Sequence, residues 1–127
     1  MATLKEIMTA EVFTTTRGTP VAEVARSMLK GQFGSAVVME GSVLLGIFTE
    51  RDVLRAAASG ADLSSSPVAE WMTNDPVTAN PDMDADDAAE IMISQGFRHL
   101  PVVEGTSITG IVSLRDILRV RVRRARQ

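Results

Sequence analysis

The sequence contains no cysteine and a single histidine among its 127 residues. A chain without cysteine forms no disulfide, offers no thiolate to a metal and has no thiol nucleophile. His99 alone cannot assemble a multi-ligand metal site. The sequence therefore predicts no metal centre, and it excludes cysteine-based catalysis.

Long apolar runs and the usual catalytic motifs are missing as well. No stretch reaches the roughly 18–20 apolar residues of a membrane span, and "MATLKEIMTAEV" lacks the basic and then apolar pattern of a secretory signal. No GxxxxGK[S/T] phosphate loop and no paired acid–base constellation can be placed. We therefore expect a cytoplasmic protein that is not an enzyme and has no catalytic cofactor.

The charge that is present is unevenly distributed. The chain is 45% hydrophobic and 23% charged, with a net charge of −3, which fits one globular domain. Six of the thirteen basic residues fall at the C-terminal end: Arg115, Arg119, Arg121, Arg123, Arg124 and Arg126. Such a tail can bind nucleic acid through phosphate contacts. It can also be a solvated helix end whose arginines complement the helix dipole; this interpretation is preferred, and nucleic-acid binding stays open as the alternative.

The chain contains two copies of one sequence repeat. When it is shifted by 64 residues on itself, residues 6–55 and 70–119 align without a gap and share sixteen identities in fifty positions. Identity at this level over a fixed offset indicates a tandem duplication. Among the matched pairs are Met8/Met72, Phe33/Phe97, Gly46/Gly110 and Asp52/Asp116.

Each copy predicts the same order of elements, β-α-β-β-α. An opening turn (4–8, 68–72) and an extended piece (12–14, 77–78) precede an amphipathic helix, with Thr19 and Asp84 as expected N-caps. A hairpin follows, and a closing helix begins at Glu50 or Leu114. We expect an α/β (α+β) fold of two repeats packed face to face with pseudo-twofold symmetry. Its expected divisions are residues 1–60, a connector at 61–67, residues 68–121 and a basic tail at 122–127.

The strand-to-helix junctions carry the motif of interest. Thr49-x-x-Asp52 and Ser113-x-x-Asp116 both fit a capping box. A helix N-terminus that follows a strand also offers free N–H groups to a phosphate, and a nearby carboxylate is a common partner of ribose hydroxyls. The motif is therefore compatible with a cap, a ligand site or both.

Together with the "RHLPVVE" strand and the G-h-x-[S/T]-x-x-D junction, the repeat resembles a cystathionine β-synthase (CBS) domain pair, or Bateman module, over roughly residues 3–119. The resemblance implies a regulatory sensor that binds AMP, ADP, ATP, NAD or S-adenosylmethionine in clefts between its repeats, AMP and ATP being favoured. It also implies a homodimer that signals to a protein target.

The resemblance further implies roles for individual residues. Asp116 and Asp52 would hold ribose hydroxyls, and Ser113 and Thr49 would contact ribose or phosphate. The remaining candidates are strand residues at the adenine edge (Leu100, Pro101; Ser35, Ala36, Val37), segments completing each site (Thr3, Met8; Ser66, Met72) and arginines near a phosphate (Arg51, Arg115).

The two sites are expected to differ. The second copy has Arg98 and His99 where the first has Gly34 and Ser35, and fixed cations favour phosphate. The Asp116 site is therefore expected to bind a phosphorylated ligand more tightly than the Asp52 site, although His99 also fits a half-buried strand residue. An alternative function is a nucleic-acid or protein adaptor that acts through the arginine-rich tail.

Overall fold

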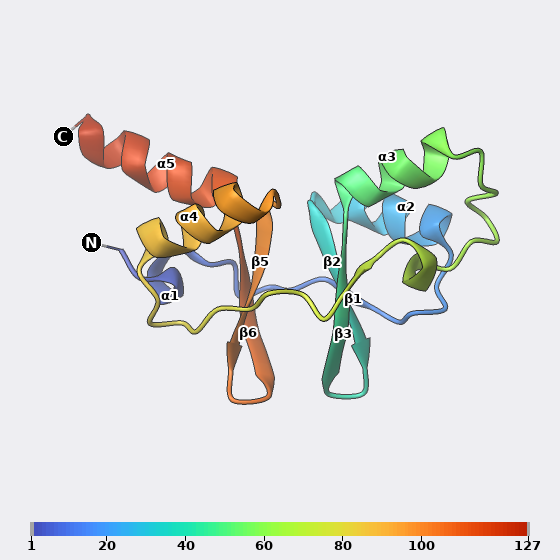
Figure 1. Ribbon diagram of the computed structural model, residues 1–127, viewed down its shortest axis with the longest axis horizontal. Coiled ribbons are helices and arrows are strands. Elements are labelled where there is room, and N and C mark those ends of the chain that lie inside the picture. Colours follow the sequence, from blue (N-terminus) through green and yellow to red (C-terminus); the bar gives the residue numbers. More distant parts are fainter. Residues whose placement is uncertain (1, 127) are drawn as a thin grey trace. The chain divides into compact units, whose positions relative to one another are not determined.

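The computed structural model describes residues 2–126, which divide into two compact units (Figure 1). One unit combines the segment up to Val12 with the chain from Val77 onward, and the other spans Phe13–Pro76. Each unit therefore contains the hairpin and helices of one repeat together with the segment that opens the other repeat.

The unit formed by Phe13–Pro76 is built around a four-stranded sheet in the order β1-β2-β3-β4. Strand β1 pairs with β2 in parallel, and the other pairs are antiparallel. Its elements are β1 (Thr14–Thr15), α2 (Val21–Gly31), β2 (Ser35–Glu40), β3 (Val43–Thr49), α3 (Glu50–Ala58), the 3-10 helix η1 (Val68–Glu70) and β4 (Thr73–Asn74).

The second unit repeats this arrangement around the antiparallel hairpin β5–β6. A parallel bridge from Ala79 to Val102 and an antiparallel bridge from Thr9 to Ile111 flank the hairpin where β1 and β4 flank β2–β3. Its elements are α1 (Leu4–Ile7), α4 (Ala85–Gln95), β5 (His99–Glu104), β6 (Ser107–Ser113) and α5 (Leu114–Ala125). The predicted α/β class and the repeated β-α-β-β-α order are confirmed.

Both hairpins turn at glycines, Gly41 and Gly105, whose φ angles are 59° and 63°. Side chains with a Cβ are disfavoured there, so glycine fixes the turn and with it the strand register. The register then shifts once in each hairpin, after Val38 and after Val102. These matching irregularities are β-bulges that bend the two hairpins in the same way.

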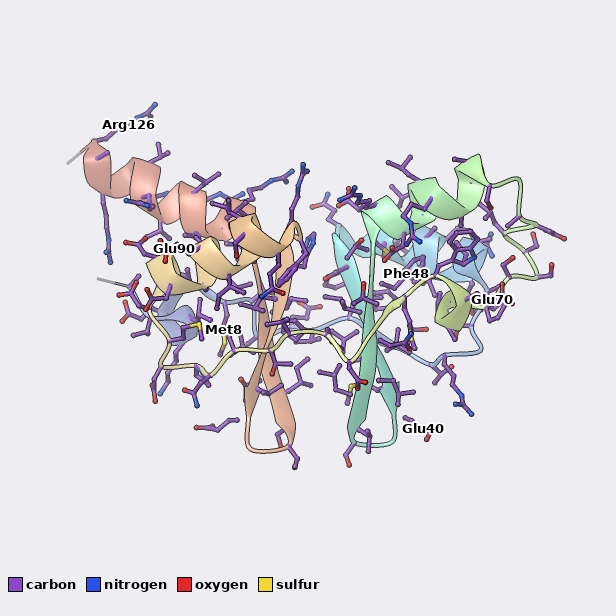
Figure 2. All side chains as sticks on the ribbon, in the orientation of Figure 1. Met8, Glu40, Phe48, Glu70, Glu90 and Arg126 are labelled. Atoms are coloured by element: carbon purple, nitrogen blue, oxygen red, sulfur yellow. The ribbon has the colours of Figure 1, made fainter. Side chains whose placement is uncertain are left out.

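The apolar face of each helix pair covers its own hairpin. In the Phe13–Pro76 unit, Val21, Val24 and Met28 of α2 recur at helical spacing and are buried against β2 and β3. Phe48 of β3 is fully buried in this cluster (Figure 2). The counterpart cluster contains Ala85, Ala88 and Met92 of α4, Leu100, Val102 and Val112 of the hairpin, and Ile117 of α5.

Local capping differs from the prediction at one helix. Asp84 is the N-cap of α4, as expected, and its carboxylate accepts the Asp86 N–H at 2.8 Å. At α2, however, the N-cap is Pro20 and not Thr19. The Thr19 hydroxyl bonds the Thr16 hydroxyl at 2.9 Å, and its carbonyl accepts the Val68 N–H at 2.9 Å. These contacts keep Thr19 in the preceding turn, so the helix starts one residue later.

Helix α5 continues through Ala125, so the described part of the predicted basic tail at 122–127 is helical up to that residue. The extended piece expected at 77–78 makes its sheet contact one residue later, at Ala79.

Candidate ligand-binding sites

Capping boxes close both strand-to-helix junctions. At α5, the Asp116 carboxylate accepts the Ser113 backbone N–H at 3.1 Å, and the Ser113 hydroxyl accepts the Asp116 N–H at 3.1 Å. At α3, Asp52 Oδ2 accepts the Thr49 N–H at 2.9 Å and the Thr49 hydroxyl at 3.3 Å. Each box uses the Oδ2 atom of its aspartate and makes no use of the Oδ1 atom.

The Oδ1 atoms of the two aspartates differ in their surroundings. Asp52 Oδ1 accepts Arg55 Nη1 at 2.8 Å, and the Asp52 side chain is only 8% exposed. Asp116 Oδ1 lies 3.9 Å from Arg119 Nη1, and the Asp116 side chain is 26% exposed. A ligand therefore meets a more accessible carboxylate oxygen at Asp116 than at Asp52.

The α5 capping box gives a prediction for stability. Ser113→Ala should lower the free energy of unfolding by about 1 kcal/mol, because the Asp116 N–H loses its side-chain acceptor. Urea denaturation measures the change. Ser107→Ala, an exposed serine at the start of β6, is the matched control. Equal unfolding free energies for both variants would show that the Ser113 hydroxyl is not a stabilising cap.

The candidate cations lie beside the same junction. His99 opens β5 opposite Ser113, and the Arg98 carbonyl accepts the Leu114 N–H at 2.9 Å. The structure thus brings Arg98, His99, Ser113 and Asp116 to one end of the hairpin. In the other unit Ser35 lies opposite Thr49 and is 6% exposed, and the Gly34 carbonyl accepts the Glu50 N–H at 3.2 Å.

Backbone groups of the strand residues expected to hydrogen-bond adenine already form hydrogen bonds between strands. The Pro101 carbonyl accepts the Ala79 N–H at 3.0 Å, and the Val37 N–H donates to the Phe13 carbonyl at 2.9 Å. Leu100 and Ala36 are fully buried and pair with Val112 and Phe48. A ligand contact at these positions would use the remaining lone pair of a carbonyl, a constraint that the sequence pattern did not reveal.

The opening segments place only some of their candidates at the junctions. Met8 lies against Gly110, and Met72 lies against Gly46, where an added Cβ would be 2.6 and 2.8 Å from the respective sulfur atoms. Thr3 instead bridges Asp84 at the start of α4. The Ser66 carbonyl likewise accepts the Val21 N–H at the start of α2, at 2.8 Å.

Arg51 and Arg115 are the second residues of α3 and α5, and both are exposed. Within residues 2–126 neither forms a salt bridge. This placement fits a phosphate contact and a solvated helix-start arginine equally well.

Sequence reasoning missed the arginines that face the two aspartates and the aromatic ring that accompanies one of them. Arg55 donates to Asp52, reaches the Trp71 carbonyl at 3.4 Å and stacks on the Trp71 ring at 5.7 Å from its centroid. The signal was available, because the Asp-x-x-Arg spacing places oppositely charged side chains on one helix face, and it occurs in both copies.

Other kinds of site find little support in the part of the chain that the structure describes. Residues 2–126 contain no group of three or more histidine, cysteine or acidic side chains placed to hold a metal. None of the helices described is both long enough and apolar enough to span a bilayer. A cavity of 360 Å³ lies between the start of α4 and the C-terminal half of α5, and none of the candidate site residues lines it.

The repeats and their junctions can be compared with known proteins. The family model of the CBS domain matches twice, over residues 4–59 and 68–123. The chain belongs to the CBS domain family. This confirms the resemblance inferred from the sequence, and no catalytic family is indicated.

Relatives match nearly the whole CBS pair. The CBS domain-containing protein YhcV of Bacillus subtilis is 36% identical over 118 residues, covering 92% of this chain and 84% of YhcV. The CBS-domain containing protein ATU1752 of Agrobacterium tumefaciens has a TM-score of 0.87 at 31% identity, covering 94% and 99%. The CBS domain pair of protein MJ0100, solved with 5′-methylthioadenosine and S-adenosyl-L-methionine, has a TM-score of 0.89 at 25% identity, covering 98% of both chains.

Proposed function

We propose that this CBS pair is a non-catalytic regulatory module that binds an adenosine-containing ligand at the Ser113–Asp116 junction. The accessible Asp116 carboxylate, held in a capping box beside Arg98 and His99, is the observation that carries the proposal. The nucleosides bound to the CBS pair of MJ0100 support the class of ligand. Candidate ligands are AMP, ADP, ATP, NAD and S-adenosylmethionine, with AMP or ATP favoured by the cations.

Each group has a physical role in this proposal. Asp116 accepts hydrogen bonds from ribose hydroxyls, and Ser113 contacts the ribose or phosphate. Arg98 and Arg115 supply positive charge to a phosphate and His99 offers a ring N–H, and phosphate binding is further favoured by the N-terminus of α5. The Asp52 junction is the weaker second site, because Arg55 already bonds its carboxylate at 2.8 Å.

A regulatory effect requires a difference in ligand affinity between two arrangements of the protein. We propose that the ligand stabilises one arrangement of the two repeats and that a protein target binds this arrangement preferentially. The target reads the change at a surface of the module, so no chemical step is needed.

A thermal-shift screen tests the ligand class. Binding to the folded state raises apparent stability by mass action, so AMP, ATP, NAD or S-adenosylmethionine should raise the melting temperature in a concentration-dependent way. Guanosine monophosphate serves as a control for a phosphate and ribose without adenine. Equal shifts with guanosine and adenosine monophosphates would contradict adenosine recognition.

We also propose that the module forms a homodimer through its helices. Leu29 of α2 and Leu54 of α3 are 82% and 70% exposed, and Ile93 of α4 and Leu118 of α5, at the equivalent positions of the other repeat, are 68% and 54% exposed. Paired exposed apolar side chains on helices are typical of contact surfaces. Analytical ultracentrifugation should find a dimer that Leu54→Glu with Leu118→Glu converts to a monomer; Val43→Glu, at an exposed hairpin position, should not. A wild-type monomer with and without AMP would contradict the proposal.

One surface favours the alternative adaptor function. Arg115, Arg119 and Arg123 recur every four residues along one exposed face of α5, and Arg126 follows as the exposed C-cap residue. Four cations in a row suit the phosphates of a nucleic acid, whose binding would weaken as salt rises. A mobility-shift assay with duplex DNA tests this function: a complex lost in Arg119→Gln/Arg123→Gln would support it, and no complex at low salt would remove the nucleic-acid version.

A further inference from the structure

The contact between Arg55 and Trp71 has no counterpart in the sequence of the other copy. Trp71 is the C-cap residue that follows η1, and its ring lies under the Arg55 guanidinium, with 5.7 Å from Arg55 Cζ to the ring centroid. At the equivalent position, 64 residues earlier, the chain has Ile7. An isoleucine offers neither a π face nor any attraction for a cation, so Arg119 has no such support from that position.

The ring contact coincides with a closer ion pair. Arg55 Nη1 is 2.8 Å from Asp52 Oδ1, whereas Arg119 Nη1 is 3.9 Å from Asp116 Oδ1. Arg55 also donates to the Trp71 carbonyl at 3.4 Å. Arg55 Nη1 therefore donates to both Asp52 and the Trp71 carbonyl, while the guanidinium lies over the Trp71 ring.

Hydrogen bonding of the indole does not account for a tryptophan at this position. The Trp71 N–H is buried, and it has no acceptor within residues 2–126. A buried donor without an acceptor lowers stability, so a ring with no N–H would serve packing better. The contact that the tryptophan ring does make with a polar group is its stacking on Arg55.

Both oxygens of the Asp52 carboxylate already accept hydrogen bonds within the protein. Oδ2 accepts from Thr49, and Oδ1 accepts from Arg55. A ribose hydroxyl that binds Asp52 must therefore compete with Arg55 for Oδ1, on a side chain that is only 8% exposed. At Asp116 the corresponding Oδ1 atom lies 3.9 Å from Arg119 Nη1, which is too far for a hydrogen bond. The Asp116 side chain is also more exposed, at 26%.

We infer that Trp71 increases the difference in affinity between the two junctions, by holding Arg55 on Asp52 as an internal competitor of the ligand. The Asp52–Arg55–Trp71 triad makes Trp71 a specificity-determining residue of the weaker site, although it touches no ligand itself. This inference rests on the proposed function, because the competition matters only if the junctions bind nucleosides.

A measurement without ligand tests the triad itself. Trp71 is the only tryptophan of the chain, so intrinsic fluorescence reports its surroundings directly. Arg55→Met and Asp52→Asn should both change the Trp71 emission, the first by removing the cation and the second by releasing it. Arg119→Met and Asp116→Asn are the matched controls and should leave the emission unchanged. Emission that is unaltered by both Arg55→Met and Asp52→Asn would overturn the inference.

Calorimetric titration with AMP tests the competition. In an Asp116→Ala background, which isolates the Asp52 junction, Trp71→Ile should tighten AMP binding by about three- to tenfold, the worth of one partly desolvated cation–π contact. Arg55→Gln should have the same effect with Trp71 in place. Trp71→Phe keeps an aromatic ring and should stay close to the Asp116→Ala parent. An Asp116→Asn background gives the same comparison if Asp116→Ala does not fold.

The outcomes separate the two proposals. Absence of AMP, ATP, NAD and S-adenosylmethionine binding to the unaltered chain would refute the proposed function, and with it the competition, even where the fluorescence confirms the triad. Binding to the unaltered chain with no gain in Trp71→Ile and Arg55→Gln would overturn the inference alone. A loss of affinity in Arg55→Gln would overturn it too, because Arg55 would then assist the ligand.

Discussion

Asp116→Ala is expected to weaken AMP binding by about 10- to 100-fold, whereas Asp52→Ala should weaken it by less than about threefold. A carboxylate that accepts hydrogen bonds from ribose hydroxyls contributes about 1.5–3 kcal/mol, and each 1.4 kcal/mol is a factor of ten in affinity. The Asp116 side chain is 26% exposed and its Oδ1 lies 3.9 Å from Arg119 Nη1, whereas Asp52 Oδ1 accepts a hydrogen bond from Arg55 at 2.8 Å. Isothermal titration calorimetry of both variants with AMP measures the two effects.

Asp116 is also a helix-capping residue, so its loss of affinity must be separated from a loss of fold. Ser113→Ala weakens the same cap and leaves the carboxylate in place. Thermal unfolding of Ser113→Ala and Asp116→Ala, measured side by side, shows how much stability is lost with the cap alone. Equal losses of affinity in Asp116→Ala and Asp52→Ala would contradict the ranking of the two sites.

Gly46→Ala is expected to lower the free energy of unfolding by about 3 kcal/mol, the upper end of the range for overpacking a tight site. An added Cβ would lie 2.6 Å from the Thr73 carbonyl oxygen and 2.8 Å from the Met72 sulfur. Thr73 belongs to β4, which pairs with β3 beside Gly46. The sheet must open to admit the methyl group, and Met72 must move away from the junction.

Two glycines serve as comparisons for Gly46 in urea denaturation. At Gly110 the nearest atom to an added Cβ is the flexible Met8 sulfur at 2.6 Å, and the Thr9 carbonyl is at 3.0 Å, so Gly110→Ala should cost only about 1 kcal/mol. At Gly18 nothing lies within 4 Å, and Gly18→Ala should change stability least. A Gly46→Ala protein as stable as Gly18→Ala would show that β4 does not pack tightly on β3.

Much of the fold could be predicted because the sequence pattern of one repeat occurs twice in the chain. The offset of 64 residues identified a hairpin in each copy, and the structure turns both hairpins at glycines with positive φ angles, Gly41 and Gly105. The closing helices begin at Glu50 and Leu114, as expected. Hydrophobic periodicity and turn residues depend on neighbouring positions in the chain, so the elements that they determine can be predicted from the sequence.

What could not be predicted depends on contacts between distant segments. Thr19 had the right chemistry for an N-cap, but a carbonyl contact with Val68 holds it in the preceding turn. Met8 and Met72 were expected near the junctions, yet their packing against Gly110 and Gly46 is a consequence of close backbone approach. Propensities for single residues do not contain such contacts.

The candidate sites show the same division. The hydroxyl and carboxylate pairs were readable from their spacing, and the structure places them in the expected capping boxes. A difference in ligand affinity between the two sites was expected from Arg98 and His99. The structure suggests a second reason for it, the ion pair between Arg55 and Asp52. Trp71, which contacts Arg55, lies 16 residues further along the chain. At this sequence separation, residue spacing no longer indicates contact.

The most direct test is calorimetric titration of the unaltered chain with AMP, followed by competition with S-adenosylmethionine. We predict saturable binding with one tighter site per chain, and displacement of AMP by S-adenosylmethionine because both carry the same adenosine group. A folded protein that gives no saturable heat with AMP, ATP, NAD or S-adenosylmethionine at millimolar concentration would contradict a role in adenosine-ligand sensing.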